Sequence, residues 1–214
     1  TSAGHWLLWN RAAVGGPSNN TIHMVALTAP VANGGTEYEG QDGSLIYFRS
    51  MDEGATWDQQ DVILPGMDST FFNSYRADSY HLMADGNTVA LAVFNQWADM
   101  ILMKSTDNGS TWTKTIINDF ELDLYEVDTG SDIDNDGIFD TLGTCDESGS
   151  GIIDHNGMVH LWFGNMRVLD ADLGGQDDLI GETIAPVRAP SINLADGRAA
   201  VPESCYEGWF DIDR

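Results

Sequence analysis

Hydrophobic and polar residues alternate in short runs along most of the chain, and turn residues separate the runs. The runs LIYFRS and MILMKS, which start at residues 45 and 100, are typical of β-strands. A turn and a second short run follow each of them. No segment has the period of about 3.6 residues that marks an amphipathic helix. The pattern therefore predicts an all-β protein of short antiparallel strands.

A second kind of hairpin lies between these two. Runs at 80–83 and 88–94 flank the turn ADGN, and runs at 151–153 and 158–163 flank the turn DHNG. An Asp-Gly or Asn-Gly pair between alternating runs is a strong hairpin signal. Similar hairpins are predicted near each end of the chain, over 6–27 and 191–201. Together the two kinds of hairpin make a repeating unit of four short strands, which is typical of β-propeller blades.

The turn between the third and fourth strand of the unit has the same pattern in two copies. Residues 50–57 and 105–112 both read S-x-D-x-G-x-T-W. This motif resembles the Asp box, or BNR repeat, of sialidase-like β-propellers of the secreted bacterial type. The resemblance implies side chains that hydrogen-bond the turn itself, glycines in conformations barred to other residues, and tryptophans buried between neighbouring sheets. The residues concerned are Ser50, Asp52, Gly54 and Trp57 in the first copy and Ser105, Asp107, Gly109 and Trp112 in the second.

The resemblance also sets the expected organisation. We expect propeller blades over residues 1–185, with an insertion at about 120–150, and further blade strands or the start of another segment over 186–214. Sialidase-like propellers are similar to six-bladed wheels, so this chain should form a partial wheel of about three to four blades. The rest of the same chain or a partner chain would close the wheel. Thr1 is not a start Met, so we expect a removed leader or a fragment of a longer protein.

The insertion carries the sequence DIDNDGIFD, which predicts a calcium site. Carboxylates at alternate positions followed by a glycine suit a Ca²⁺ loop, and the stretch resembles the loops of thrombospondin type-3 repeats. The predicted ligands are Asp132, Asp134, Asp136, the carbonyl of Ile138, and Asp140. Asp128, Asp146 or Glu147 is the predicted further ligand that completes the coordination shell of the ion. The alternative is a solvated acidic loop without an ion.

Loops of this kind should gather on one face of the propeller. Connections from the second to the third strand, and from one unit to the next, lie opposite the S-x-D-x-G-x-T-W turns. The long ones are expected at 30–43, 65–75 and 164–178, beside the acidic insertion. Because function sits on loops that a rigid scaffold holds, this face is the predicted ligand face.

Two cysteines and a few arginines complete the candidate chemistry. Cys145 and Cys205 are predicted to form a disulfide in an oxidising compartment, with two buried thiols as the alternative. By resemblance, a sialidase site needs three arginines around a carboxylate and a tyrosine nucleophile assisted by a glutamate. The candidates for such roles are Arg76, Arg188, Tyr206, Glu207 and the pair Tyr125 and Glu126. No residue is assigned as catalytic.

Charge narrows the range of functions. The formal net charge is −25, which disfavours binding to nucleic acid or to anionic lipid. No apolar run is long enough to span a bilayer. We therefore expect an extracellular or cell-surface propeller, stabilised by calcium, that binds or displays glycan or protein partners without catalysis. The alternatives are an exo-acting sialidase-like glycoside hydrolase and a structural module of a large secreted bacterial adhesin.

Overall fold

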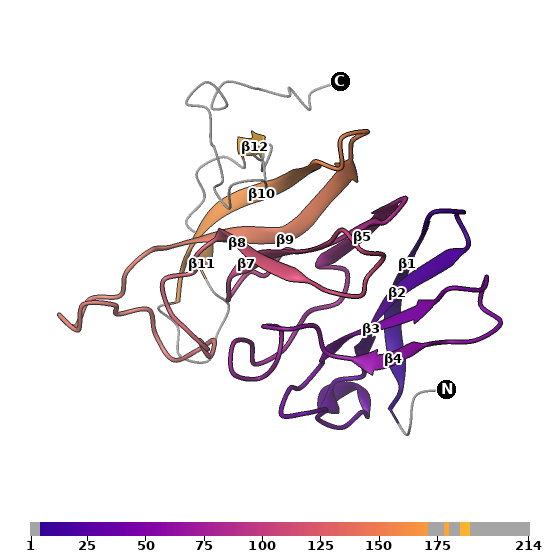
Figure 1. The fold of residues 1–214 in the computed structure, drawn as a ribbon. Coiled ribbons are helices and arrows are strands. Elements are labelled where there is room, and N and C mark those ends of the chain that lie inside the picture. The colour runs from indigo at the N-terminus through magenta and orange to yellow at the C-terminus, as the bar shows by residue number, and fades with distance from the viewer. Residues whose placement is uncertain (1–4, 171–177, 180–184, 189–214) are drawn as a thin grey trace, which may run out of the picture.

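The protein consists of antiparallel β-sheets joined by long loops (Figure 1). The computed structural model describes residues 5–170, 178–179 and 185–188. Within these residues the helical element is one short 3₁₀ turn, η1, at Val31–Asn33. None of the described segments is a helix long and apolar enough to cross a membrane. The predicted all-β class is confirmed.

The first two sheets are four-stranded meanders, in which each strand pairs with the next one along the chain. Each sheet contains one of the two S-x-D-x-G-x-T-W turns, which connects its third strand to its fourth. The strands of the first sheet are β1 (Leu7–Gly15), β2 (Thr21–Thr28), β3 (Leu45–Ser50) and β4 (Gln59–Val62). Those of the second sheet are β5 (Tyr80–Asp85), β6 (Thr88–Val93), β7 (Met100–Ser105) and β8 (Thr113–Asn118).

The third sheet has a longer hairpin than the sequence pattern predicts. Strand β9 covers Leu142–Ile153 and β10 covers Val159–Leu169, and the short strands β11 (Asp178–Leu179) and β12 (Ala185–Arg188) also pair with β10. The sequence analysis placed 142–150 in the insertion and started a loop at 164. Glycines in this segment interrupt the alternation of hydrophobic and polar residues that predicts a strand. They are needed for packing: a Cβ on Gly149 would lie 2.2 Å from the ring of Phe94, so only glycine fits there.

The three sheets are successive blades of a partial propeller. The first strands of neighbouring sheets contact each other, β1 with β5 and β5 with β9, and the second sheet lies between the other two (Figure 1). One apolar core fills the space between the first and second sheets, and another fills the space between the second and third. The described blades thus form an open arc, as expected for part of a wheel.

The two repeated turns make the same hydrogen bonds. In the first, the Ser50 hydroxyl donates to Asp52 (2.9 Å) and accepts from the Gly54 N–H (2.8 Å), while the Thr56 N–H donates to Asp52 (2.7 Å). In the second, the corresponding distances are 2.7, 2.9 and 2.8 Å. In both turns the glycine has a positive φ, 90° at Gly54 and 77° at Gly109.

The tryptophans of these turns are half-buried, which corrects the expectation of full burial. Trp112 packs edge-on against Tyr47 of the first sheet, with ring centroids 5.1 Å apart. Trp57 packs edge-on against Phe48, 6.4 Å away, on the other face of that sheet. The described residues place no further sheet against that face, so Trp57 stays partly exposed.

Polar side chains join the first two sheets at the turns. Arg49 of β3 is buried, and its guanidinium donates to the Asn108 carbonyl (2.7 Å) and the Ser110 hydroxyl (2.9 Å) of the second turn. Asp58 pairs with the other edge of the guanidinium at 2.6 Å. Each nitrogen of the guanidinium therefore has an acceptor, which lowers the cost of burying this charge.

His23 of β2 lies beside Arg49, in the same contact between the first and second sheets. The ring is fully buried, and Nδ1 lies 2.7 Å from the Tyr47 hydroxyl. Burial is the main reason that the pKa of His23 falls from 6.5 to about 4, and the Arg49 charge lowers it further. His23 is therefore neutral in the folded protein at neutral pH.

This pKa predicts that acid lowers the stability of the folded protein, because His23 must become protonated inside the contact between the sheets. The folded pKa is below the unfolded one, so the stabilisation is complete above pH 6.5 and is lost as the pH falls toward 4. Over that window the free energy of unfolding should drop by about 3 kcal/mol. Urea unfolding at several pH values would measure it. His23→Gln should remove this part of the pH dependence, whereas His155→Gln, at an exposed position, should keep it.

Candidate functional site

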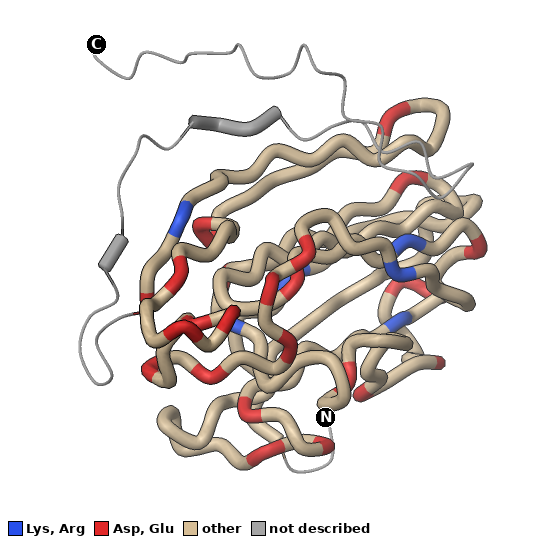
Figure 2. Tube along the Cα trace, turned by 90° about the vertical axis from the view of Figure 1, so that its left-hand side faces the viewer, with Lys and Arg blue, Asp and Glu red and all other residues tan. Residues whose placement is uncertain are grey.

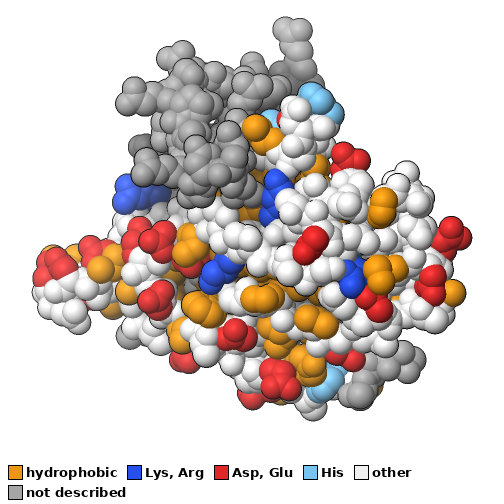
Figure 3. Space-filling view, in the orientation of Figure 1, with side chains coloured by type: hydrophobic (Ala, Val, Ile, Leu, Met, Phe, Trp, Pro, Cys, Tyr) orange, Lys and Arg blue, Asp and Glu red, His pale blue; other side chains and the backbone are white. Residues whose placement is uncertain are grey.

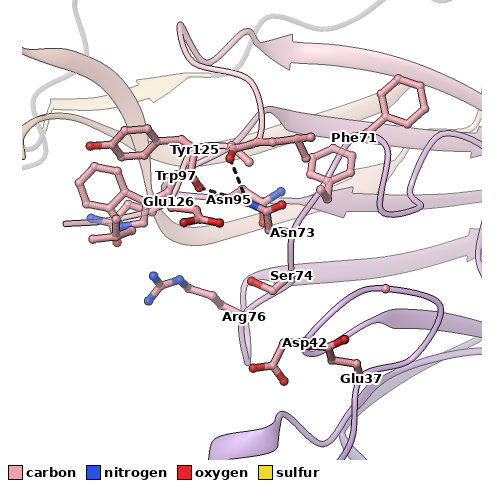
Figure 4. A pocket seen from close by; sticks show the side chains of 16 residues that line it. Glu37, Asp42, Phe71, Asn73, Ser74, Arg76, Asn95, Trp97, Tyr125 and Glu126 are labelled. Carbon is pink, nitrogen blue, oxygen red and sulfur yellow. Dashed lines mark hydrogen bonds between the residues drawn. The ribbon is translucent and has the colours of Figure 1, made fainter. Parts of the chain in front are cut away.

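A pocket of about 450 Å³ opens on the face opposite the repeated turns. Four connections form it, those between β2 and β3, β4 and β5, β6 and β7, and β8 and β9. It is lined by residues of the segments 37–42, 71–76, 95–98 and 124–127 (Figure 4). Two of the three loops expected on the ligand face, at 30–43 and 65–75, and the acidic insertion contribute to it. The third expected loop is replaced at 164–169 by β10.

Aromatic side chains form one side of the pocket. Trp97 is 8% exposed and lies 5.8 Å from Tyr125, ring centroid to ring centroid. Phe120 supports both rings from behind, at 6.4 Å from Trp97 and 6.0 Å from Tyr125. Phe71 is 50% exposed, and the Lys114 ammonium lies 3.8 Å from its ring centroid. Trp97 and Tyr125 thus pack against a supporting ring, whereas Phe71 is open to solvent and contacts Lys114.

Amide and carboxylate groups surround these rings. The Asn73 side chain donates to the backbone carbonyls of Leu124 (3.0 Å) and Tyr125 (3.4 Å), and so ties two connections together (Figure 4). Glu37 and Asp42 lie on the wall opposite Tyr125 and Trp97 (Figure 4). The pocket therefore combines flat apolar surfaces with hydrogen-bonding groups.

Arg76 lines the pocket next to the first strand of the second sheet. Its Nε lies 3.1 Å from Oε1 of Glu147 on β9. Glu147 has φ of +63°, which is unfavourable for a side chain with a Cβ. Burial raises the pKa of Glu147, and the Arg76 charge opposes that shift. Glu147 was offered as a calcium ligand in the sequence analysis; the structure pairs it with Arg76.

A buried carboxylate fastens the pocket wall to the base of the acidic insertion. Asp170, which is fully buried, accepts hydrogen bonds from the Tyr125 hydroxyl and from the Gly130 N–H, the latter at 3.1 Å. The Ser131 N–H donates to the Asp170 carbonyl at 3.3 Å. Asp170 thus holds both the Tyr125 ring of the pocket and the start of the acidic stretch, residues 130–140 of the acidic insertion.

Three of the predicted calcium ligands gather in the acidic stretch. Carboxylate oxygens of Asp132, Asp134 and Asp136 lie within 4.8 Å of one another. Asp140 is not in this cluster and accepts a hydrogen bond from the Ile133 N–H at 2.9 Å. Ile138 donates its N–H to Asp136 at 2.8 Å. The stretch projects from the left side of the molecule in Figure 1, and Asp and Glu positions are spread over the loops (Figure 2).

Several other candidates fall beyond what the structure describes. The backbone of Arg188 lies in β12, but its side chain is outside the described part. Tyr206, Glu207 and Cys205 lie outside the described residues. Cys145 is buried, and burial raises the pKa of its thiol to about 12. Its disulfide with Cys205 stays a prediction.

Sequence reasoning found the loops of the pocket but few of its residues. Arg76, Tyr125 and Glu126 were candidates for sialidase-like roles, and all three line the pocket. Trp97 and Asn95 were not singled out, because they lie in the short connection after β6 and belong to no recognised motif. Arg76 is the one arginine that lines the pocket among the described residues. The described site therefore does not contain the three arginines of a sialidase constellation.

Comparison with known proteins gives distant likenesses. No protein family matches the chain, and no curated protein matches it either. The similar solved structures include a protein of unknown function from Dyadobacter fermentans DSM 18053 (16% identity, TM-score 0.43), a Trypanosoma rangeli sialidase in complex with 2,3-difluoro-KDN (15%, 0.34) and the GH43 protein BlXynB from Bacillus licheniformis (12%, 0.25).

These likenesses extend over most of this chain but over smaller shares of the other proteins. They cover 86%, 81% and 76% of this chain, and 55%, 29% and 37% of the three compared chains, in the same order. The chain thus spans about half the length of the first of them. The assignment as a partial propeller rests on the sheets of this chain itself.

Asp170 gives a direct test of how the pocket wall is held. Asp170→Ala leaves the Tyr125 hydroxyl and the Gly130 N–H without their acceptor, so the free energy of unfolding should fall by about 3 kcal/mol. Tyr125→Phe removes one of the two hydrogen bonds and should cost about 1 kcal/mol. Urea unfolding would measure both. Equal stability of Asp170→Ala and the unchanged protein would show that this carboxylate does not hold the wall.

Proposed function

We propose that this protein is an extracellular or cell-surface propeller module that binds a carbohydrate in the pocket, without a reaction. The observation that carries the proposal is the combination of rings and hydrogen-bonding groups in one open site. A sugar has apolar C–H faces, which pack on aromatic rings such as Phe71 and Tyr125, and a rim of hydroxyls, which amides and carboxylates bind. The volume of about 450 Å³ suits a small ligand.

Charge favours a neutral or amino sugar over an acidic one. Glu37, Asp42 and Glu126 line the pocket, and Arg76 is already paired with Glu147 at 3.1 Å. The net charge of −25 adds a repulsive field for anions. These charges support a binding module for neutral glycans more than a sialidase, whose substrate carries a carboxylate. Other blades, from the rest of the chain or from a partner, would complete the wheel around this face.

A panel of neutral, amino and acidic oligosaccharides tests the binding proposal. We expect neutral or amino sugars to bind by calorimetry, and Phe71→Ala and Glu126→Gln each to weaken binding about ten-fold or more, since each removes a contact group. Phe139→Ala is the matched control, because Phe139 is 38% exposed and lies in the acidic insertion outside the pocket. Its affinity should not change.

Two results would contradict this proposal. Preference for sialosides would reverse the assigned ligand class. Release of new reducing ends from a bound oligosaccharide would replace binding with hydrolysis, for which pocket carboxylates such as Glu126 would be the groups to examine.

We propose in addition that the acidic stretch holds Ca²⁺. The proposal is supported by the convergence of Asp132, Asp134 and Asp136 within 4.8 Å, because three like charges so close repel one another unless a cation lies between them. Backbone N–H groups orient the carboxylates: Asp132 accepts from Asp136 at 3.1 Å and from Gly137 at 3.0 Å. Calcium would stiffen the stretch that follows the pocket wall.

Thermal unfolding with and without calcium tests this second proposal. With a Kd of about 10⁻³ M, typical of extracellular sites, 10 mM Ca²⁺ should add about 1.4 kcal/mol to the free energy of unfolding and raise Tm. Asp134→Ala should abolish the gain. Asp123→Ala, an exposed acidic position of the same connection outside the cluster, should keep it. Identical Tm values in chelator and in Ca²⁺ would mean a solvated acidic loop.

A further inference from the structure

A second aromatic surface lies across one loop from the pocket. Trp6, just before β1, is 67% exposed, more than any other large hydrophobic side chain of the described residues except Ile138. Tryptophan is rarely left so open on a protein surface, because its ring gains more from burial than most side chains do. The Trp6 ring is therefore accessible for a ligand to pack against.

The backbone beside this ring is fixed. The Trp6 carbonyl accepts a hydrogen bond from the Ala29 N–H at 2.8 Å, at the point where the connection from β2 to β3 begins. His5 packs edge-on against Tyr38 of the same connection, with centroids 4.7 Å apart. Trp6 thus does not sit at the end of a loose strand: contacts on both sides tie it to this connection.

A small hollow of about 60 Å³ adjoins the ring. It is lined by Trp6, Ala29, Gly34, Gly35 and Thr36, with His5 at its edge. The two glycines bring no side chain into the hollow, and a Cβ on Gly34 would lie 3.5 Å from the Trp6 ring. The hollow therefore offers one exposed aromatic ring, and the Thr36 hydroxyl at its edge lies 3.4 Å from Nδ1 of His5.

The hollow and the main pocket share a wall. Thr36 lines the hollow, and the next residue, Glu37, lines the pocket. Gly40 and Asp42 of the same connection also line the pocket. Hydrophobic side chains are visible over the lower loops in Figure 3, on the side where these connections lie in Figure 1. A ligand that leaves the pocket over residues 36–37 would meet the Trp6 ring.

We infer that Trp6 is a second sugar-binding position, so that the module takes an extended neutral oligosaccharide and not a single sugar. The inference rests on the proposed function, since it assigns the pocket to a carbohydrate. In this arrangement one part of the glycan occupies the pocket, the chain crosses Thr36 and Glu37, and a further sugar unit packs on the Trp6 ring. Thr36 lies at the crossing, with its hydroxyl 3.4 Å from Nδ1 of His5.

Chain length is the variable that tests this inference. Cello-, xylo-, malto- and chito-oligosaccharides of two and six units would be titrated by calorimetry against the unchanged protein and its variants. For the series that binds, the hexasaccharide should bind about ten-fold more tightly than the disaccharide. Trp6→Ala should bring the hexasaccharide close to the disaccharide and leave the disaccharide unchanged. Trp6→Phe, which keeps a ring, should restore part of the difference.

Controls separate this inference from the proposed function. Trp162→Ala alters another exposed tryptophan, 43% exposed on β10 and outside both hollows, and should not change either affinity. Equal weakening of both sugars by Trp6→Ala, or no weakening, would overturn the second position while binding in the pocket stands. If none of the sugars binds, the proposed function fails and the second position fails with it.

Discussion

The contact between neighbouring sheets at the repeated turns is the constraint on which the rest of the structure depends. The Arg49 guanidinium reaches from one sheet into the turn of the next, and a Cβ on Gly109 would lie 2.2 Å from the Tyr47 hydroxyl. These contacts leave no room to shift one sheet along the other. Strands are stiff and their register is fixed. The contact between two sheets at the repeated turns therefore also sets where their opposite ends, which carry the long loops, lie relative to each other.

The loop face follows from that constraint. The connections that leave the far ends of the strands are brought together, although they come from distant parts of the sequence. Asn73 then links two of them through the Leu124 carbonyl, and Asp170 links the wall to the acidic insertion. The scaffold is thus built from repeated elements, whereas the pocket is built from loops that have no counterpart in one another. This division allows a ligand site to form without a change in the sheets.

Carboxylates of the repeated turns and carboxylates of the pocket have different surroundings. Carboxylates of the repeated turns, such as Asp107, are used up by hydrogen bonds, chiefly from Thr111, which lower its pKa to about 2. Carboxylates of the pocket, such as Glu126, line open space. The same residue type is therefore held by local hydrogen bonds in the turns and borders open space in the pocket, and the difference lies in what surrounds it.

The sequence alone determined the strands, the turns and the face that carries the long loops. Alternation and turn residues are local properties, so the first eight strands and the matching turns could be predicted from them. It did not determine the length of β9, because Gly149 is explained only by the Phe94 ring of a neighbouring sheet. Nor did it show that Trp97 and Arg76 line one pocket, since that depends on how the sheets stack. Contacts between distant residues arise from packing, and only the tertiary structure decided them.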